Sequence, residues 1–156
     1  MAAVPAIGLV PGPGEGWWEV GRNFAIVLPG VTVVAMGFQV LSGADGSLGT
    51  FSRGLPWAII LSVSNAFVEE TLTRFGMVAA LHDPFGPRVA IWASALLFGG
   101  VHWSGLPGGP AGVALAGFLG WLLAKSLVET GGMGWAYVLH FLVDVVIFAC
   151  VLAVQP

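Results

Sequence analysis

Long apolar stretches restrict the folds open to this chain more than any other feature. A membrane-spanning helix needs about 20 mostly apolar residues. Five stretches approach or exceed that length, at about 23–41, 55–81, 88–103, 111–128 and 133–154. They show no alternation of apolar and polar residues, so strands of a membrane barrel are disfavoured. We predict an all-α, polytopic membrane bundle of about five transmembrane helices.

Composition supports a membrane protein of one domain. Of the 156 residues, 57% are hydrophobic and 8% are charged, whereas soluble domains average about 25% charged residues. We expect an irregular N-terminal segment over residues 1–22 and one transmembrane domain over 23–154. The net charge of −3 offers no basic surface for nucleic acid. The single cysteine, Cys150, excludes an internal disulfide framework.

The few basic residues predict an orientation. In a five-span arrangement Arg22, Arg88 and Lys125 fall on one side of the membrane and Arg53 falls on the other. The positive-inside rule then places the N-terminus in the cytoplasm. We expect an integral protein of a bacterial inner (plasma) membrane.

Three ionisable residues lie inside the second apolar stretch: Glu69, Glu70 and Arg74. Each such group costs roughly 2.5–3.5 kcal/mol at the centre of a membrane helix even on the mildest scale. Residues of this kind usually face a bundle interior, are paired, and mark a functional site. A chain with five basic and eight acidic residues in all has placed three of them where they are most costly.

Two more residue pairs bring polar side chains to a similar depth, Phe98 with His102 and His140 with Asp144. At about 1.5 Å of rise per residue, Glu69 lies roughly 18–20 Å from the membrane face formed by residues 82–87. The same rise places His102 roughly 21 Å, His140 roughly 10 Å and Asp144 roughly 16 Å from that face. Three helices therefore bring polar groups to overlapping depths, where they can form one site.

The spacing of the acidic residues divides their roles. Glu70 and Arg74 are four residues apart, so they share a helix face and can form an ion pair. Glu69 is rotated by about 100° and faces a different neighbour. A carboxylate without a cation in a low-dielectric site is suited to act as a general base. The alternative is an ion pair that only locks helix packing.

The histidine pairs follow the same spacing of four. The ring of Phe98 can restrict the rotamer of His102, although a single histidine in an apolar helix is more often a satisfied core residue. Asp144 can orient the imidazole of His140, or both side chains can point to one substrate oxygen. The alternative for this pair is a local hydrogen bond that stabilises the helix.

Together these residues contain what peptide-bond hydrolysis requires, a base that activates water and donors for the developing oxyanion. Glu69, His102, His140 and Asp144 are also ligand types that bind a divalent metal such as zinc. No His-Glu-x-x-His, phosphate-binding loop or nucleophile elbow is present, and Ser104 lies only in a loop.

These three elements, in this order, resemble the CPBP intramembrane proteases, also called Abi or CAAX prenyl endopeptidase-like proteins. The motifs that carry the resemblance are Glu69-Glu70-x-x-x-Arg74, Phe98-x-x-x-His102 and His140-x-x-x-Asp144, and the resemblance covers about residues 55–153. It implies an intramembrane endopeptidase of a hydrophobic or lipidated peptide, either glutamate-dependent or metal-assisted.

The resemblance also implies a role for each residue. Glu69 and His102 would activate the attacking water, Glu70 and Arg74 would support them, and His140 and Asp144 would form the oxyanion-binding side. Asp144 departs from the asparagine that many relatives carry there, which favours an orienting or ligating role. Relatives commonly have six to eight transmembrane helices, so this chain can be a minimal core that a membrane partner completes.

A second hypothesis is a catalytically idle family member that serves as a structural or scaffolding subunit of a larger membrane complex. Seven tryptophans and twenty-four glycines suit packing against other subunits or pigments, with histidines as haem or chlorophyll ligands. A metal or proton transporter is a poor third hypothesis, because the chain has no internal repeat.

Overall fold

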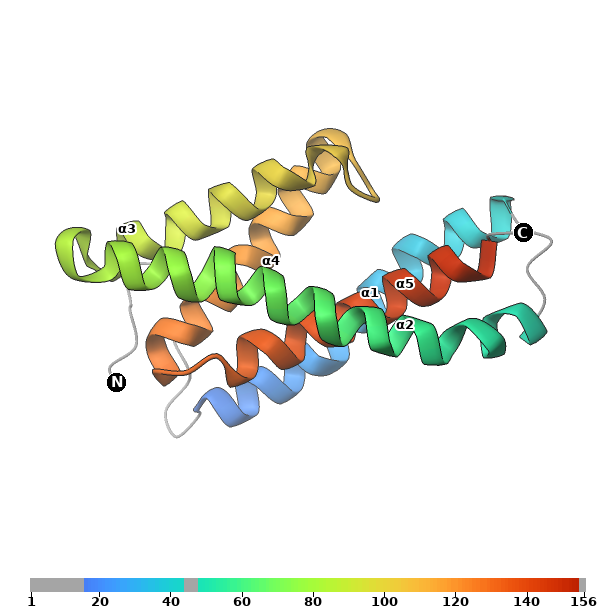
Figure 1. Cartoon of the computed structure of the whole chain (residues 1–156), viewed down its shortest axis with the longest axis horizontal. Coiled ribbons are helices and arrows are strands. Elements are labelled where there is room, and N and C mark those ends of the chain that lie inside the picture. Colours follow the sequence, from blue (N-terminus) through green and yellow to red (C-terminus); the bar gives the residue numbers. More distant parts are fainter. Residues whose placement is uncertain (1–15, 44–47, 155–156) are drawn as a thin grey trace.

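The computed structural model describes residues 16–43 and 48–154, and every regular element in those ranges is helical. The α-helices are α1 (Trp17–Gly43), α2 (Leu48–Glu69), α3 (Met77–Val101), α4 (Gly109–Thr130) and α5 (Gly134–Val154). A π-helical turn, η2 (Glu70–Gly76), joins α2 to α3, and a 3₁₀ turn, η3 (His102–Ser104), follows α3. Figure 1 shows these helices as one elongated bundle. The predicted all-α membrane bundle is confirmed.

The chain reverses at residues 82–87, the segment expected to form one membrane face. Gly86 adopts φ 82° and ψ 166° inside α3, a left-handed backbone that glycine adopts without steric cost. Pro84 and Pro87 flank it, so the helical hydrogen-bond pattern fails on both sides of the reversal. The predicted spans 55–81 and 88–103 therefore lie on opposite sides of this bend. In Figure 1 the second half of α3 folds back over the first.

Three of the described helical segments are long and apolar enough to cross a membrane: Trp17–Gly37, Gly109–Thr130 and Gly134–Ala153. The other two predicted spans form helices but do not meet that measure, so the count of five is not reached. The charges of the Glu-Glu-x-x-x-Arg motif lower the apolar character of the second span, and the third is shortened by the bend at Gly86.

The start of α1 corrects another expectation. Residues 17–22 are helical, although the segment 1–22 was expected to be irregular; residues 1–15 of that segment lie outside the described residues. Tertiary packing accounts for the earlier start. A Cβ on Gly21 would lie 2.4 Å from the ring of Trp135, so this glycine allows the indole to pack directly on the α1 backbone.

The core centres on α4. All residues from Leu122 to Glu129 are buried, as expected for a helix surrounded by other helices. One apolar cluster joins this segment to α3, and a second joins it to α1 and α5. At the crossing of α3 and α4, a Cβ on Gly99 would lie 2.8 Å from the Val113 carbonyl oxygen. Small residues permit such close backbone approach in membrane bundles.

Candidate active site

Glu69 and Glu70 lie where α2 passes into the π-helical turn η2. Such turns are rare and occur frequently at functional sites. Thr71 Oγ1 donates to the Phe67 carbonyl at 2.7 Å, and Thr73 Oγ1 donates to the Glu69 carbonyl at 2.6 Å. Both bonds satisfy carbonyl oxygens of the turn, and irregular helix in a membrane needs such compensation. The two threonines between the motif's charged residues therefore suit its local conformation.

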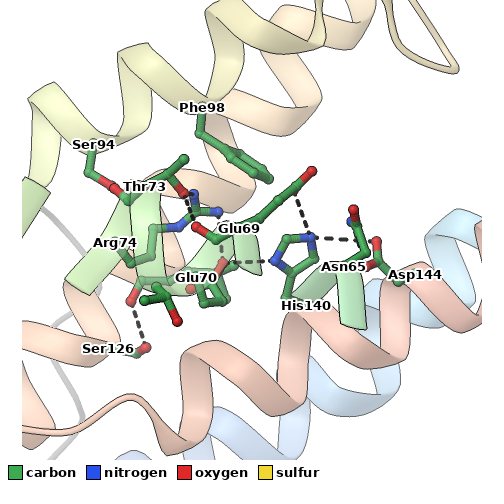
Figure 2. Close-up of polar contacts among 12 residues, drawn as sticks. Asn65, Glu69, Glu70, Thr73, Arg74, Ser94, Phe98, Ser126, His140 and Asp144 are labelled. Atoms are coloured by element: carbon green, nitrogen blue, oxygen red, sulfur yellow. Dashed lines mark hydrogen bonds and ion pairs between the residues drawn. The ribbon is translucent and has the colours of Figure 1, made fainter. Parts of the chain in front are cut away.

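Arg74 and Glu70 form the predicted ion pair. The Arg74 Nη2 atom lies 3.2 Å from Glu70 Oε1, and both side chains are fully buried. The guanidinium also stacks on Phe98, with Cζ 3.6 Å from the ring centroid, and Nη1 donates to Thr73 Oγ1. Ser94 Oγ donates to the Thr73 carbonyl at 2.6 Å, so α3 is tied to the same turn. These contacts fix the position of Glu70 (Figure 2).

His140 lies at the centre of the polar cluster. Its Nδ1 atom is 2.7 Å from Glu70 Oε1, while its Nε2 atom is 3.5 Å from both Glu69 Oε2 and Asp144 Oδ1. Figure 2 shows the imidazole between these carboxylates. The spacing of four between His140 and Asp144 brings them together as predicted. The bond from His140 to Glu70 was not predicted, and it joins two of the three motifs directly.

The hydrogen-bonding capacities of these groups constrain the protons of the site. Glu70, paired with Arg74, can only accept a hydrogen bond, so the Nδ1 atom of His140 carries a hydrogen. The Nε2 atom then faces two carboxylate oxygens, from Glu69 and Asp144. A proton on Nε2 or on one of the carboxylates favours this arrangement, because it supplies a donor between acceptor atoms. The three atoms are therefore placed so that they can share one proton.

The two adjacent glutamates differ in access. The Glu70 side chain is completely buried, whereas the Glu69 side chain is 31% exposed. Glu69 Oε2 is itself buried, yet it accepts no hydrogen bond from any residue that the structure describes. Figure 2 shows this carboxylate beside the Phe98 ring, with one oxygen directed away from His140. Glu69 is thus the carboxylate that a substrate or water can reach.

His102 joins the site through Phe98. Its Nδ1 atom lies 2.7 Å from the Phe98 carbonyl oxygen, so Nδ1 donates and Nε2 is left as the acceptor in the neutral ring. The Phe98 ring centroid lies 4.3 Å from that of His102 and 5.4 Å from that of His140. The expected restraint of His102 by Phe98 is present. Within the described chain, His102 makes no direct polar contact with Glu69.

An apolar cavity of about 380 Å³ adjoins the cluster. Its volume lies within the roughly 300–1,000 Å³ typical of ligand pockets. The cavity is lined by apolar side chains of α1, α4 and α5, and its polar lining residues are Thr32, His102, His140 and Asp144. Two histidines from different helices therefore meet at the wall of one hydrophobic space.

Asn65 is a site residue that the sequence analysis missed. Its Nδ2 atom donates to Asp144 Oδ2 at 3.1 Å. The signal was available, because Asn65 precedes Glu69 by four residues and so shares its helix face. Since Asp144 accepts this bond and faces His140, its contacts suit an orienting carboxylate rather than a donor to an oxyanion.

The residues do not fit a metal site in this arrangement. Among the described residues, no three His, Cys, Asp or Glu side chains are placed so that they could hold a metal ion. The Nδ1 atoms of His102 and His140 are bonded to the Phe98 carbonyl and to Glu70, which leaves the Nε2 atom of each ring for other contacts. The contacts among Glu69, His140 and Asp144 are those of an acid–base cluster, and we derive no chemical step through a metal.

The fold and the site define an integral membrane protein of helices that encloses acid–base side chains beside an apolar cavity. The family model described as type II CAAX prenyl endopeptidase Rce1-like matches residues 51–146. The chain belongs to this family of CAAX-type intramembrane proteases, which confirms the resemblance drawn from the motifs. The matched region contains every predicted site residue and leaves α1 outside it. No curated protein and no solved structure matches the chain significantly.

Proposed function

We propose that the chain is an intramembrane endopeptidase that hydrolyses a hydrophobic or lipidated peptide with water activated by Glu69 and His102. The observation that carries this proposal is the state of Glu69 Oε2. This oxygen is buried, accepts no hydrogen bond from the described residues, and lies 3.5 Å from Nε2 of His140, a residue that lines the apolar cavity. A carboxylate oxygen that accepts no hydrogen bond is suited to accept a proton from water.

In the proposed reaction Glu69 removes a proton from a water molecule held between it and the Nε2 atom of His102. The water oxygen bonds to the carbonyl carbon of the scissile peptide, and the carbonyl electron pair moves to its oxygen. Glu69 then passes the proton to the amide nitrogen as the carbon–nitrogen bond breaks. Acid–base assistance of this kind contributes about 10²–10⁴-fold to a rate.

His140 is the proposed donor to the oxyanion. Its Nδ1 atom is held by Glu70, which is in turn held by Arg74, so the ring is oriented before substrate binds. When Nε2 carries the shared proton, it can donate to the negative oxygen that develops in the transition state. Asp144, fixed by Asn65, would favour the charged ring. The apolar cavity would bind the hydrocarbon part of the substrate.

The test is cleavage of a farnesylated peptide by the protein in liposomes. Glu69→Gln preserves side-chain shape and should lower kcat by about 10²–10⁴-fold. Asp83→Asn is the matched control, because Asp83 is 94% exposed and lies in the turn at 82–87; it should leave the rate unchanged. Equal cleavage by wild type and Glu69→Gln contradicts the proposal. No cleavage by any form favours the alternative of a catalytically idle structural subunit.

We also propose residence in a bacterial inner membrane with a cytoplasmic N-terminus. Lys125 is buried against Glu129, so this orientation depends on Arg22, which precedes the first predicted span, and on Arg88, which begins the third. Labelling of a cysteine introduced near the N-terminus, in a Cys150→Ser background, with a membrane-impermeant maleimide tests it. Labelling in intact cells would reverse the proposed orientation.

A further inference from the structure

A second buried ion pair lies outside the candidate active site. Lys125 and Glu129, four residues apart on α4, are in direct contact, and their side chains are 0% and 3% exposed. Glu129 Oε2 also accepts a hydrogen bond from the indole Nε1 of Trp17 at 2.8 Å. We refer to these three residues as the α1–α4 clasp. They connect the first residue of α1 with the last turn of α4.

The start of α1 is firmly held at this end. Trp17, Phe24 and Leu28 pack on a core formed by α4 and α5. The ring centroids of Trp18 and Trp135 lie 5.8 Å apart, next to the contact of Trp135 with the backbone of α1. In Figure 1 the start of α1 and the end of α4 lie near each other at the lower left, and the two helices diverge from there.

The apolar cavity begins beside the held part of α1, since Phe24 and Leu28 also line it, and it continues along the helix. Val27, Val31 and Ala35 line it from α1, and Leu115 and Ala116 line it from α4. Pro29 lies inside α1, with three of the lining residues of this helix before it and four after it. Proline removes one helical hydrogen bond and bends a helix. The clasp therefore ties α1 to α4 at one end of the cavity, while α1 packs along α5.

We propose that the α1–α4 clasp determines which apolar chains the protease accepts, by holding α1 at the angle that sets the cavity width. Trp17 is a positioning residue in this proposal and does not touch the reacting atoms. The proposal rests on the proposed function, because the hydrocarbon chain in the cavity is taken to be part of a peptide substrate. The occupant is a flexible hydrocarbon chain, because the lining is apolar apart from Thr32 and the site residues.

The test compares a peptide carrying a farnesyl group with the same peptide carrying the longer geranylgeranyl group. Trp17→Phe keeps an aromatic ring but removes the N–H donor to Glu129. This variant should raise kcat/KM for the geranylgeranyl peptide relative to that for the farnesyl peptide by at least about threefold. The change is small compared with the roughly 10–200-fold discrimination that one methylene group can produce in an apolar pocket. Trp57→Phe is the matched control, because Trp57 lies on α2 and is 65% exposed, and it should leave the ratio unchanged. Ala116→Leu narrows the cavity and should lower the ratio.

An unchanged ratio in folded Trp17→Phe, or an equal fall for both substrates, overturns the proposal. If Trp17→Phe does not accumulate, the double variant Lys125→Met with Glu129→Met takes its place. It removes both charges of the clasp and the acceptor for the Trp17 N–H, and it should shift the ratio in the same direction. The dissociation constants of the two peptides are also measured in a Glu69→Gln background. If the clasp variants change the ratio of the two dissociation constants but the wild type cleaves neither peptide, only the protease function is refuted. If the wild type cleaves the peptides but the clasp variants leave the ratio unchanged, only this proposal is refuted.

Discussion

Replacement of Glu70 by glutamine should destabilise the protein far more than the same replacement at Glu69. The introduced amide keeps an oxygen that can accept the hydrogen bond from His140, but the negative charge beside Arg74 is lost. The guanidinium is fully buried and cannot release its proton, so it becomes an uncompensated buried charge. Breaking a buried pair in this way costs about 3–5 kcal/mol. Stacking on Phe98 does not offset this cost, because it is present before and after the change.

Thermal unfolding in detergent, followed by circular dichroism, measures the effect. A loss of about 3–5 kcal/mol corresponds to a fall in apparent Tm on the order of 10 °C for a chain of this size. Glu69→Gln is the matched control, because Glu69 Oε2 accepts no hydrogen bond from the described residues; its Tm should change little. This outcome would separate the two adjacent carboxylates, Glu70 as a residue required for stability and Glu69 as the base of the proposed reaction.

A double variant tests whether the lost charge is the cause. Arg74→Met removes the cation together with a stacking contact worth about 2 kcal/mol when desolvated, although Glu70 can then neutralise itself by binding a proton. Combining Glu70→Gln with Arg74→Met leaves no buried charge in the pair, so the double variant should be more stable than the sum of the single losses by about 0.5–3 kcal/mol. Strict additivity, or equal melting of Glu70→Gln and Glu69→Gln, would refute the reasoning.

Other contacts give further predictions. Asn65→Ala leaves Asp144 Oδ2 without its donor and should lower kcat for peptide hydrolysis about tenfold, while an unchanged kcat would remove Asn65 from the site. Gly99→Ala places a Cβ 2.8 Å from a carbonyl oxygen of α4, whereas a Cβ on Gly117 meets nothing closer than 3.8 Å. Gly99→Ala should therefore lower the free energy of unfolding by about 1–3 kcal/mol through overpacking. Equal melting temperatures for Gly99→Ala and Gly117→Ala would contradict that packing. Phe98→Leu removes the ring that stacks on the guanidinium and should cost about 2 kcal/mol, measured by the same melting experiment.

Contacts within single helices were the part of the site that could be predicted. The spacing of four between Glu70 and Arg74, and between His140 and Asp144, correctly brought each pair together. Helix geometry alone sets such neighbours, whatever surrounds the helix. The different surroundings of the two glutamates followed in the same way from their rotation on the helix, and the structure confirms that only Glu70 contacts the arginine cation.

Contacts between helices could not be predicted in the same detail. Asn65 with Asp144 and His140 with Glu70 each join α5 to the region where α2 passes into η2. Depth along the membrane limited which residues could meet, but it did not define the rotation of each helix about its own axis. The π-helical turn adds to this difficulty, because it changes the direction of side chains within one apparent span.

The sequence by itself determined that this chain forms a membrane bundle of helices with charged side chains inside it. The length of its apolar stretches and the cost of charges in a membrane require that result. Only the tertiary structure decided that Glu70 serves the arginine and His140 together, that Glu69 remains accessible, and that an apolar cavity lies beside them. Those features depend on how helices rotate and pack against one another, and helices that are apolar on most faces carry little local information about which face turns inward.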